Sequence, residues 1–270
     1  MKSALKVIVS IFLILLVLFG IGFAALPLPG TIPILMYHFI DSPEKAAKDK
    51  NIVSRQSFER QMAFLRRFGY RVLTPDEFYA IKTGEKKPRG REILITFDDG
   101  NESFERDAFP VLQKYSFPAA IFVVSESVKR GLHGSMSQET LKKLVQSGLV
   151  TVGSHSKTHP LLSKMTDEQI EDELVNSKKD LEQMLGVPIL DLAYPSGDVD
   201  TRVIETAQQA GYRMAFSTSY KKLKGIDEGL YSLERVKISR TSDWLPVFWF
   251  KVTGIYHSFK REWYHLRHRN

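Results

Sequence analysis

The chain has 270 residues, 43% of them hydrophobic, which is enough for one sizeable domain with a full core and too few for two large ones. It contains no cysteine, which excludes disulfides, thiolate metal sites and cysteine nucleophiles. Its net charge of +7 at pH 7 favours anionic surroundings such as lipid headgroups or cell-wall polymers. Because no nucleic-acid-binding motif of basic and aromatic residues occurs, we expect no nucleic-acid partner.

An apolar segment opens the chain. Residues 7–26 are apolar apart from one serine and two glycines, and they follow Lys2 and Lys6. This length spans a bilayer, and the positive charges before it favour a cytoplasmic N-terminus. A cleaved signal peptide is the alternative, although the sequence GFA at residues 22–24 lacks a clean Ala-x-Ala pattern. We expect residues 1–26 to be a single-pass anchor in the cell membrane, with the rest extracytoplasmic, or secreted if the anchor is cleaved.

Strand and helix signals alternate after this segment. The predicted strands cover residues 34–40, 71–73, 92–97, 119–124, 149–154, 189–194, 214–218 and 235–239. The predicted helices cover residues 57–68, 104–115, 137–147, 166–185 and 201–210, and Thr74, Pro75 and Glu77 form the start signature of another. This alternation is typical of a parallel sheet, and at this length of an α/β barrel over residues 27–240.

The C-terminal tail, residues 241–270, differs in composition from the barrel segment. It holds all three tryptophans of the chain together with further aromatic and basic residues. Aromatic and basic side chains together suit a membrane interface. Packing of the tail against the barrel is the equally weighted alternative.

Two adjacent carboxylates, Asp98 and Asp99, follow the predicted strand 92–97 and precede Gly100. An Asp-Gly pair is common in turns, which is the simplest interpretation. However, each carboxylate makes ionisation of the other less favourable, and a bound cation would offset that repulsion. The pair also lies at the carboxyl end of a strand, where parallel α/β folds place reactive groups.

His155 and His159 follow another predicted strand. Pro160 disfavours helical backbone at His159, so the pair belongs to a strand-end loop and not to a helical zinc-protease motif. Alone, a His-x-x-x-His spacing is a weak signal. Two imidazoles and one carboxylate at the same edge of a barrel would make an open three-ligand site for zinc or a similar divalent ion.

Three motifs make the sequence resemble a known family: TFDDG at residues 96–100, HSKTH at residues 155–159 and AYPSG at residues 193–197. They resemble the motifs of the polysaccharide deacetylase family, the carbohydrate esterases that share the NodB homology domain. The resemblance covers roughly residues 34–239. It implies a distorted (β/α) barrel of about seven strands, one divalent metal ion, usually zinc but sometimes cobalt, nickel or manganese, and hydrolysis of acetyl groups on glycans.

The resemblance also assigns roles to individual residues. Asp99, His155 and His159 would hold the metal, and Asp98 would be the general base. The backbone N–H of Tyr194 would donate to the oxyanion that forms during hydrolysis.

The sequence departs from the commonest family pattern at two points. No Leu-x-His motif, the usual source of the acid, follows Ile238, but MYHFI at residues 36–40 resembles the first strand of the poly-N-acetylglucosamine deacetylase branch. His38 would then protonate the leaving amine, with a half-buried strand histidine as the alternative. The arginine that orients the base in many members is missing before Tyr194, and Arg235 is the candidate replacement, unless it is a surface arginine.

These observations predict a membrane-anchored, metal-dependent deacetylase of an N-acetylated extracellular or cell-wall glycan, either poly-N-acetylglucosamine or peptidoglycan. The alternatives are a xylan-type O-acetyl esterase and a non-catalytic, membrane-anchored glycan-binding protein. The expected partners are the acetylated polysaccharide, the membrane through the N-terminal helix, and polysaccharide synthesis or export machinery.

Overall fold

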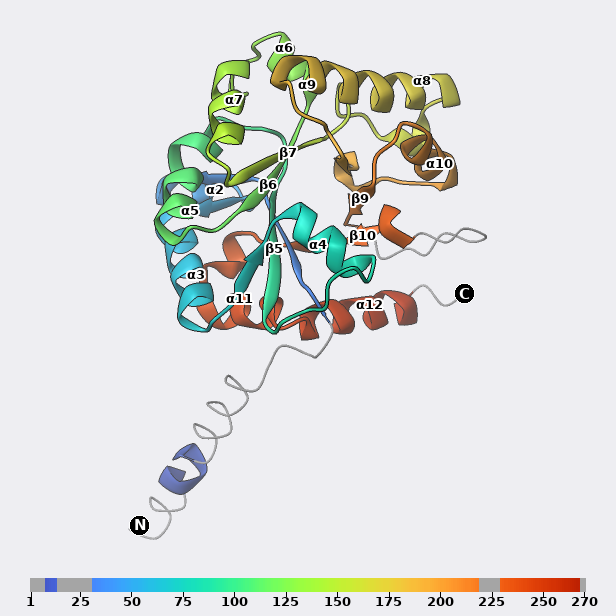
Figure 1. Cartoon of the computed structure of the whole chain (residues 1–270). Coiled ribbons are helices and arrows are strands. Elements are labelled where there is room, and N and C mark those ends of the chain that lie inside the picture. The colour runs from blue at the N-terminus through green and yellow to red at the C-terminus, as the bar shows by residue number, and fades with distance from the viewer. Residues whose placement is uncertain (1–7, 14–30, 219–228, 268–270) are drawn as a thin grey trace.

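A parallel sheet forms the centre of the computed structural model, which describes residues 8–13, 31–218 and 229–267 (Figure 1). The strands are β1 (Ile34–Tyr37), β2 (Phe39–Asp41), β3 (Ile52–Ser54), β4 (Arg71–Leu73), β5 (Glu92–Phe97), β6 (Ala119–Val123), β7 (Val150–Ser154), β8 (Asp191–Ala193), β9 (Met214–Ser217), β10 (Leu233–Glu234) and β11 (Val236–Lys237). Nine of them form one sheet in the order β10-β9-β8-β7-β6-β5-β1-β11, with β4 beside β5, and β2 and β3 pair separately.

Helices surround this sheet (Figure 1). The α-helices are α2 (Pro43–Lys48), α3 (Arg55–Arg67), α4 (Pro75–Lys82), α5 (Phe109–Tyr115), α6 (Ser125–Lys129), α7 (Gln138–Gln146), α8 (Asp167–Glu171), α9 (Ser177–Leu185), α10 (Thr201–Gln209), α11 (Leu245–Val252) and α12 (Ile255–Arg267). Two π-helical turns, η1 (Phe104–Ala108) and η3 (Asp172–Asn176), run directly into α5 and α9. Short 3-10 turns are η2 (Leu162–Lys164), η4 (Pro195–Gly197), η5 (Gly229–Tyr231) and η6 (Arg240–Asp243).

Alternate residues of the strands enter two hydrophobic clusters. In β5, Ile93 and Ile95 belong to the larger cluster, and Leu94 belongs to the smaller one with Phe122 and Phe216. Because side chains of a strand point to opposite faces in turn, both faces of this sheet are covered. A parallel sheet with both faces covered reads as a nearly continuous apolar run, and all six residues of β5 are buried.

The two ends of the main sheet meet at Arg235. β1 pairs in parallel with both β5 and β11, so the first strand lies beside the last, as the barrel prediction requires. The two ends of the strand order, β10 and β11, are consecutive in the chain, and only Arg235 separates them. The parallel, barrel-like α/β architecture is therefore confirmed. The predicted strand 235–239 is shorter in the structure, where β11 covers only Val236–Lys237 and Arg235 separates it from β10.

Several local predictions are also confirmed. β4 and β5 have the predicted bounds, and Thr74 caps α4 in a reciprocal capping box with Glu77. The predicted strand 34–40 is shorter, because β1 ends at Tyr37 and β2 pairs with β3 instead of joining the main sheet.

The structure tests the prediction for the C-terminal tail but describes little of the predicted N-terminal anchor. In the tail, Phe248 and Val252 of α11 are fully buried in the larger cluster, so this part of the tail packs against the barrel. None of the helices in the described ranges is long and apolar enough to cross a bilayer. The predicted anchor at residues 1–26 lies outside the described residues apart from residues 8–13, and it stays a prediction.

Candidate active site

The turn after β5 explains why the two aspartates precede a glycine. Asp99 and Gly100 both have left-handed backbone, with φ of 72° and 66°. Aspartate tolerates this conformation better than most residues, and glycine adopts it without strain. A Cβ at Gly100 would lie 3.1 Å from Val123 Cγ1, so the position is also tight. The turn separates the two carboxylates: Asp98 is buried and Asp99 is half-buried.

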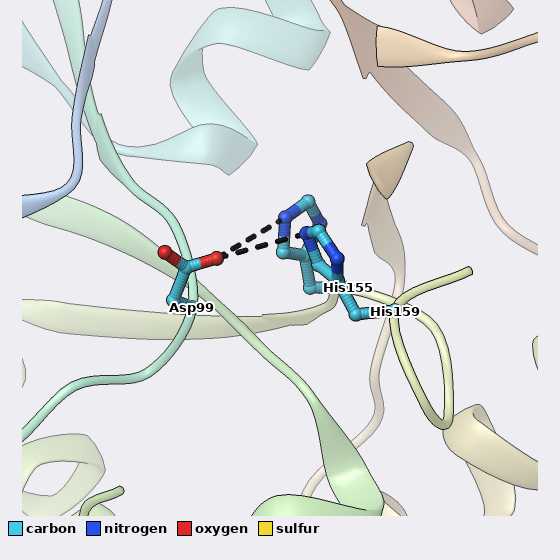
Figure 2. A group of neighbouring side chains, drawn as sticks. All are labelled: Asp99, His155 and His159. Atoms are coloured by element: carbon cyan, nitrogen blue, oxygen red, sulfur yellow. Dashed lines mark ion pairs between the residues drawn. The ribbon is translucent and has the colours of Figure 1, made fainter. Parts of the chain in front are cut away.

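Asp99, His155 and His159 lie together at this edge of the sheet (Figure 2). Asp99 Oδ1 lies 3.7 Å from His155 Nε2 and 3.8 Å from His159 Nε2, and the three ligand atoms are all within 4.8 Å of one another. Donor atoms on one tetrahedral zinc are about 3.4 Å apart. The three atoms therefore need only small movements to bind a common divalent ion.

Hydrogen bonds orient His155 for metal binding. Its Nδ1 lies 2.7 Å from the Ala193 carbonyl oxygen. A carbonyl oxygen only accepts hydrogen bonds, so Nδ1 carries the proton and Nε2 keeps its lone pair toward Asp99. This arrangement is typical of metal-binding histidines. Burial lowers the pKa of His155, which keeps the imidazole neutral as a ligand must be. The donor set and its orientation thus fit a divalent metal.

Asp98 is held by Arg235 in a bidentate ion pair. The guanidinium donates to Asp98 Oδ1 at 2.6 Å and to Oδ2 at 2.8 Å, and both side chains are at most 3% exposed. Burial alone would raise the pKa of the Asp98 carboxyl, but the Arg235 charge outweighs it, and the pKa falls to about 2. Asp98 is therefore ionised at neutral pH. Arg235 is a buried residue, which excludes the alternative of a surface arginine.

His38 lies at the same edge, directly after β1. The Asp98 N–H donates to the carbonyl oxygen of Tyr37, which places the first residue after β1 beside the first residue after β5. The Nδ1 atom of His38 is buried, and no described residue forms a hydrogen bond with it. Burial lowers the pKa of His38, while the nearby charges of Asp98 and Asp99 act in the opposite direction. His38 is half-buried, as expected for a strand histidine without a catalytic role. It nevertheless lies close enough to both aspartates for their charges to act on its pKa.

The structure corrects the prediction for Tyr194. Its backbone N–H donates to the Phe216 carbonyl oxygen at 3.0 Å, as part of the sheet, and its buried hydroxyl donates to the Tyr231 carbonyl oxygen at 3.0 Å. Neither donor is available to an oxyanion. Sequence reasoning could not see this bond, because it depends on how β8 and β9 align. The Tyr194 side chain instead anchors the AYPSG loop in the core.

Glu173 is a site residue that the sequence analysis missed. Its buried carboxylate accepts hydrogen bonds from the backbone N–H groups of Lys157 and Thr158, at 2.9 and 2.8 Å, and from the Thr158 hydroxyl at 2.5 Å. These donors belong to the loop between the two metal-binding histidines. Glu173 lies in the π-helical turn η3, and a turn of this kind is frequent at functional sites. No motif in the sequence marks this residue.

We expect Glu173→Gln to weaken zinc affinity by about 10–100-fold, because supporting residues of metal ligands have effects of this size. An amide offers one acceptor oxygen in place of two, so part of the histidine loop loses its support. Competition titration with a zinc chelator measures the change. Glu171→Gln, at an exposed position two residues earlier, is the matched control and should bind zinc like the wild type. Unchanged affinity in Glu173→Gln would exclude this positioning role.

Comparison with known proteins places these features in a family. The family model described as polysaccharide deacetylase matches residues 85–215. YxkH of Bacillus subtilis, a protein named for this family, is 35% identical over 211 residues, which cover 78% of this chain and 72% of YxkH. A poly-beta-1,6-N-acetyl-D-glucosamine N-deacetylase of Staphylococcus aureus is 29% identical over 200 residues, covering 69% of this chain and 68% of the relative.

A solved structure of a deacetylase is also similar to this chain. The deacetylase PplD of Streptococcus pyogenes, solved in complex with acetate, superposes with a TM-score of 0.71 and 29% identity, over 79% of this chain and 94% of PplD. Family model, sequence relatives and fold agree with the motifs at the strand ends. The chain belongs to the polysaccharide deacetylases, a family of hydrolases.

Proposed function

We propose that the protein is a metal-dependent deacetylase of an N-acetylated extracellular glycan, with poly-N-acetylglucosamine as the first candidate and peptidoglycan as the second. The observation that carries the proposal is that one strand end presents two carboxylates in two roles: Asp99 faces both histidines, and Asp98 faces Arg235. The similarity to the staphylococcal poly-beta-1,6-N-acetyl-D-glucosamine N-deacetylase supports the choice of glycan.

The first step of the proposed reaction is attack of water on the acetyl carbonyl carbon. A divalent ion held by Asp99, His155 and His159, with zinc as the first candidate, would lower the pKa of bound water and polarise the carbonyl oxygen. Asp98 accepts the proton of the attacking water. Its bidentate contact with Arg235 keeps it ionised and fixes its orientation, and each oxygen retains a lone pair for the proton.

Collapse of the tetrahedral intermediate requires a proton for the departing amine. His38 provides it, because it lies beside Asp98 at the end of β1 and the lowered pKa makes its protonated form a readier donor. The amine remains on the glycan and acetate leaves.

A backbone donor for the oxyanion is found by accounting for the N–H groups of the AYPSG turn. The Tyr194 N–H bonds to Phe216, Pro195 has none, and the Gly197 N–H bonds to the Tyr194 carbonyl oxygen. The Ser196 N–H is the one amide of this turn to which no described residue offers an acceptor. Ser196 also has left-handed backbone, with φ of 56°, as residues held for function often do. We assign to the Ser196 N–H the donation to the oxyanion that the sequence analysis predicted for the Tyr194 N–H.

The test measures acetate release by the full-length chain from the membrane fraction of expressing cells, purified in detergent. Its substrates are N-acetylglucosamine oligomers, peptidoglycan and acetylated xylan. Release from the oligomers that a chelator abolishes and zinc restores is the expected result, and recovery in the membrane fraction supports the predicted anchor. His38→Ala should lower turnover without lowering metal content.

The other outcomes assign the alternatives. Release from acetylated xylan alone would indicate an O-acetyl esterase, and release from peptidoglycan alone would move the substrate to the cell wall. Metal binding without release from any substrate points to a missing partner from polysaccharide synthesis or export machinery. A protein that binds no metal and releases no acetate would be a glycan-binding protein.

A further inference from the structure

Exposed large apolar side chains are concentrated at the two ends of the described chain. Three occur singly over the barrel, which is normal for a soluble surface: Leu132, Leu161 and Val175. The remainder lie in residues 8–13 of the predicted anchor or in the C-terminal tail: Ile8, Val9, Ile11, Phe12, Leu13, Trp244, Phe259, Trp263 and Leu266. The tail therefore shares with the anchor segment a property that the barrel lacks.

Three of the tail residues form one stripe along α12. Phe259, Trp263 and Leu266 are 62%, 46% and 65% exposed. Their spacing of four and three residues places them on a single face of a helix. At the start of α12, Tyr256 lies on the same side as the stripe and packs against the larger hydrophobic cluster. On the opposite side, Arg261 forms an ion pair with Glu234 at 2.8 Å. Among the described residues, no hydrophobic cluster of the barrel includes these three side chains.

Basic side chains border the stripe. The Arg267 guanidinium lies over the Trp263 ring, 4.9 Å from its centroid, and the Lys260 ammonium lies 5.6 Å from the centroid of Tyr256. Glu262 is the only acidic residue of this helix. Aromatic rings with adjoining cations are the side chains that settle at the boundary between lipid headgroups and acyl chains.

The position of α12 places the stripe near the predicted anchor. A Cβ added to Gly254, the residue before α12, would lie 2.4 Å from Thr31 Oγ1, so the helix begins in contact with the first residue of the described barrel. Figure 1 shows α12 along the edge where β1 starts. Four residues separate the end of the predicted anchor at Leu26 from Thr31, and the five extended steps between them reach at most about 18 Å.

We propose that α12 is an interfacial helix that binds the surface of an anionic lipid bilayer through Phe259, Trp263 and Leu266. The inference does not depend on the deacetylase assignment. Thr31 precedes the amino end of β1, whereas the candidate active site lies at the carboxyl ends of the strands. The helix therefore holds the barrel with its active site directed away from the lipid.

The test reports on Trp263 in the full-length chain. Trp244→Phe with Trp249→Phe leaves it as the only tryptophan. The protein is reconstituted into vesicles of phosphatidylcholine and phosphatidylglycerol with brominated acyl chains, which quench nearby indole fluorescence. We expect strong quenching in these vesicles and weaker quenching when phosphatidylglycerol is left out.

A matched control keeps Trp249 as the only tryptophan, through Trp244→Phe with Trp263→Phe. Trp249 packs against the core and should be quenched little. Lys260→Glu with Arg267→Glu should remove the dependence on phosphatidylglycerol. Equal Trp263 emission in brominated and unbrominated vesicles would overturn the proposal. Emission that shifts to the blue with rising protein concentration in lipid-free detergent would also overturn it, because a second copy of the chain would then cover the stripe.

Discussion

Asp98→Asn is expected to lower the rate of acetate release by about 10²–10⁴-fold, the range typical of general-base catalysis. The amide has nearly the shape of the carboxylate and still accepts a hydrogen bond from Arg235, but it cannot take a proton from water. Metal content should stay at the wild-type level, because Asp99, His155 and His159 supply the ligand atoms. Acetate release, elemental analysis and circular dichroism measure rate, metal content and fold.

Asp99→Asn separates the two roles of the carboxylates. It removes a ligand, so metal content and activity should fall together, whereas Asp98→Asn should reduce activity alone. A metal-loaded Asp98→Asn protein that matches the wild-type rate would show that Asp98 is not the base. Loss of metal from Asp98→Asn as well would show that both carboxylates serve the metal site.

Arg235→Met is expected to lower the free energy of unfolding by about 3–5 kcal/mol, because it leaves the Asp98 carboxylate buried without its partner. In the wild type, ionised Asp98 contributes to the free energy of unfolding at pH values above its unfolded pKa near 4. This contribution is lost as the pH falls toward the folded pKa of about 2. Without Arg235, burial raises the pKa of Asp98, so the acid limb of the pH–rate profile should move to higher pH. Urea denaturation and a pH–rate profile measure both effects.

Two comparison variants make the Arg235 result specific. Asp98→Asn with Arg235→Met has no buried carboxylate at this site, so it should recover a large part of the lost stability. Arg213→Met breaks a second bidentate pair, with the buried Asp191 at 2.8 and 3.1 Å, outside the candidate site. It should lower stability and leave the pH–rate profile unchanged. If Arg235→Met leaves the profile in place, the ion pair serves folding alone.

Local sequence patterns predicted the parts of the molecule that depend on neighbours along the chain. The apolar run of β5 and the capping box of Thr74 are local signals, and both appear in the structure. The cluster of Asp99, His155 and His159, which could hold a metal ion, was predictable because the residues follow two parallel strands. Arg235 could be named only as a candidate, since nothing near it in the sequence indicates burial.

Other features depend on contacts between distant segments, and the sequence does not encode them locally. Glu173 supports the histidine loop through a π-helical turn that no residue pattern marks. The sequence analysis assigned the oxyanion donor of the AYPSG turn to the Tyr194 N–H. It could not show that this N–H bonds to Phe216, because that bond depends on strand alignment. In the tail, α11 was missed because buried Phe248 and Val252 lie among aromatic and basic residues without a clear amphipathic period.

The ion pair between Asp98 and Arg235 also bears on how the protein folds. Asp98 and Arg235 are separated by 137 residues, and Arg235 reaches its place only when β11 pairs with β1. Contacts between residues so far apart form slowly, because much chain entropy is lost before they are made. The ion pair that orients Asp98 therefore forms only once the last strand has paired with β1, after the other strands are in place.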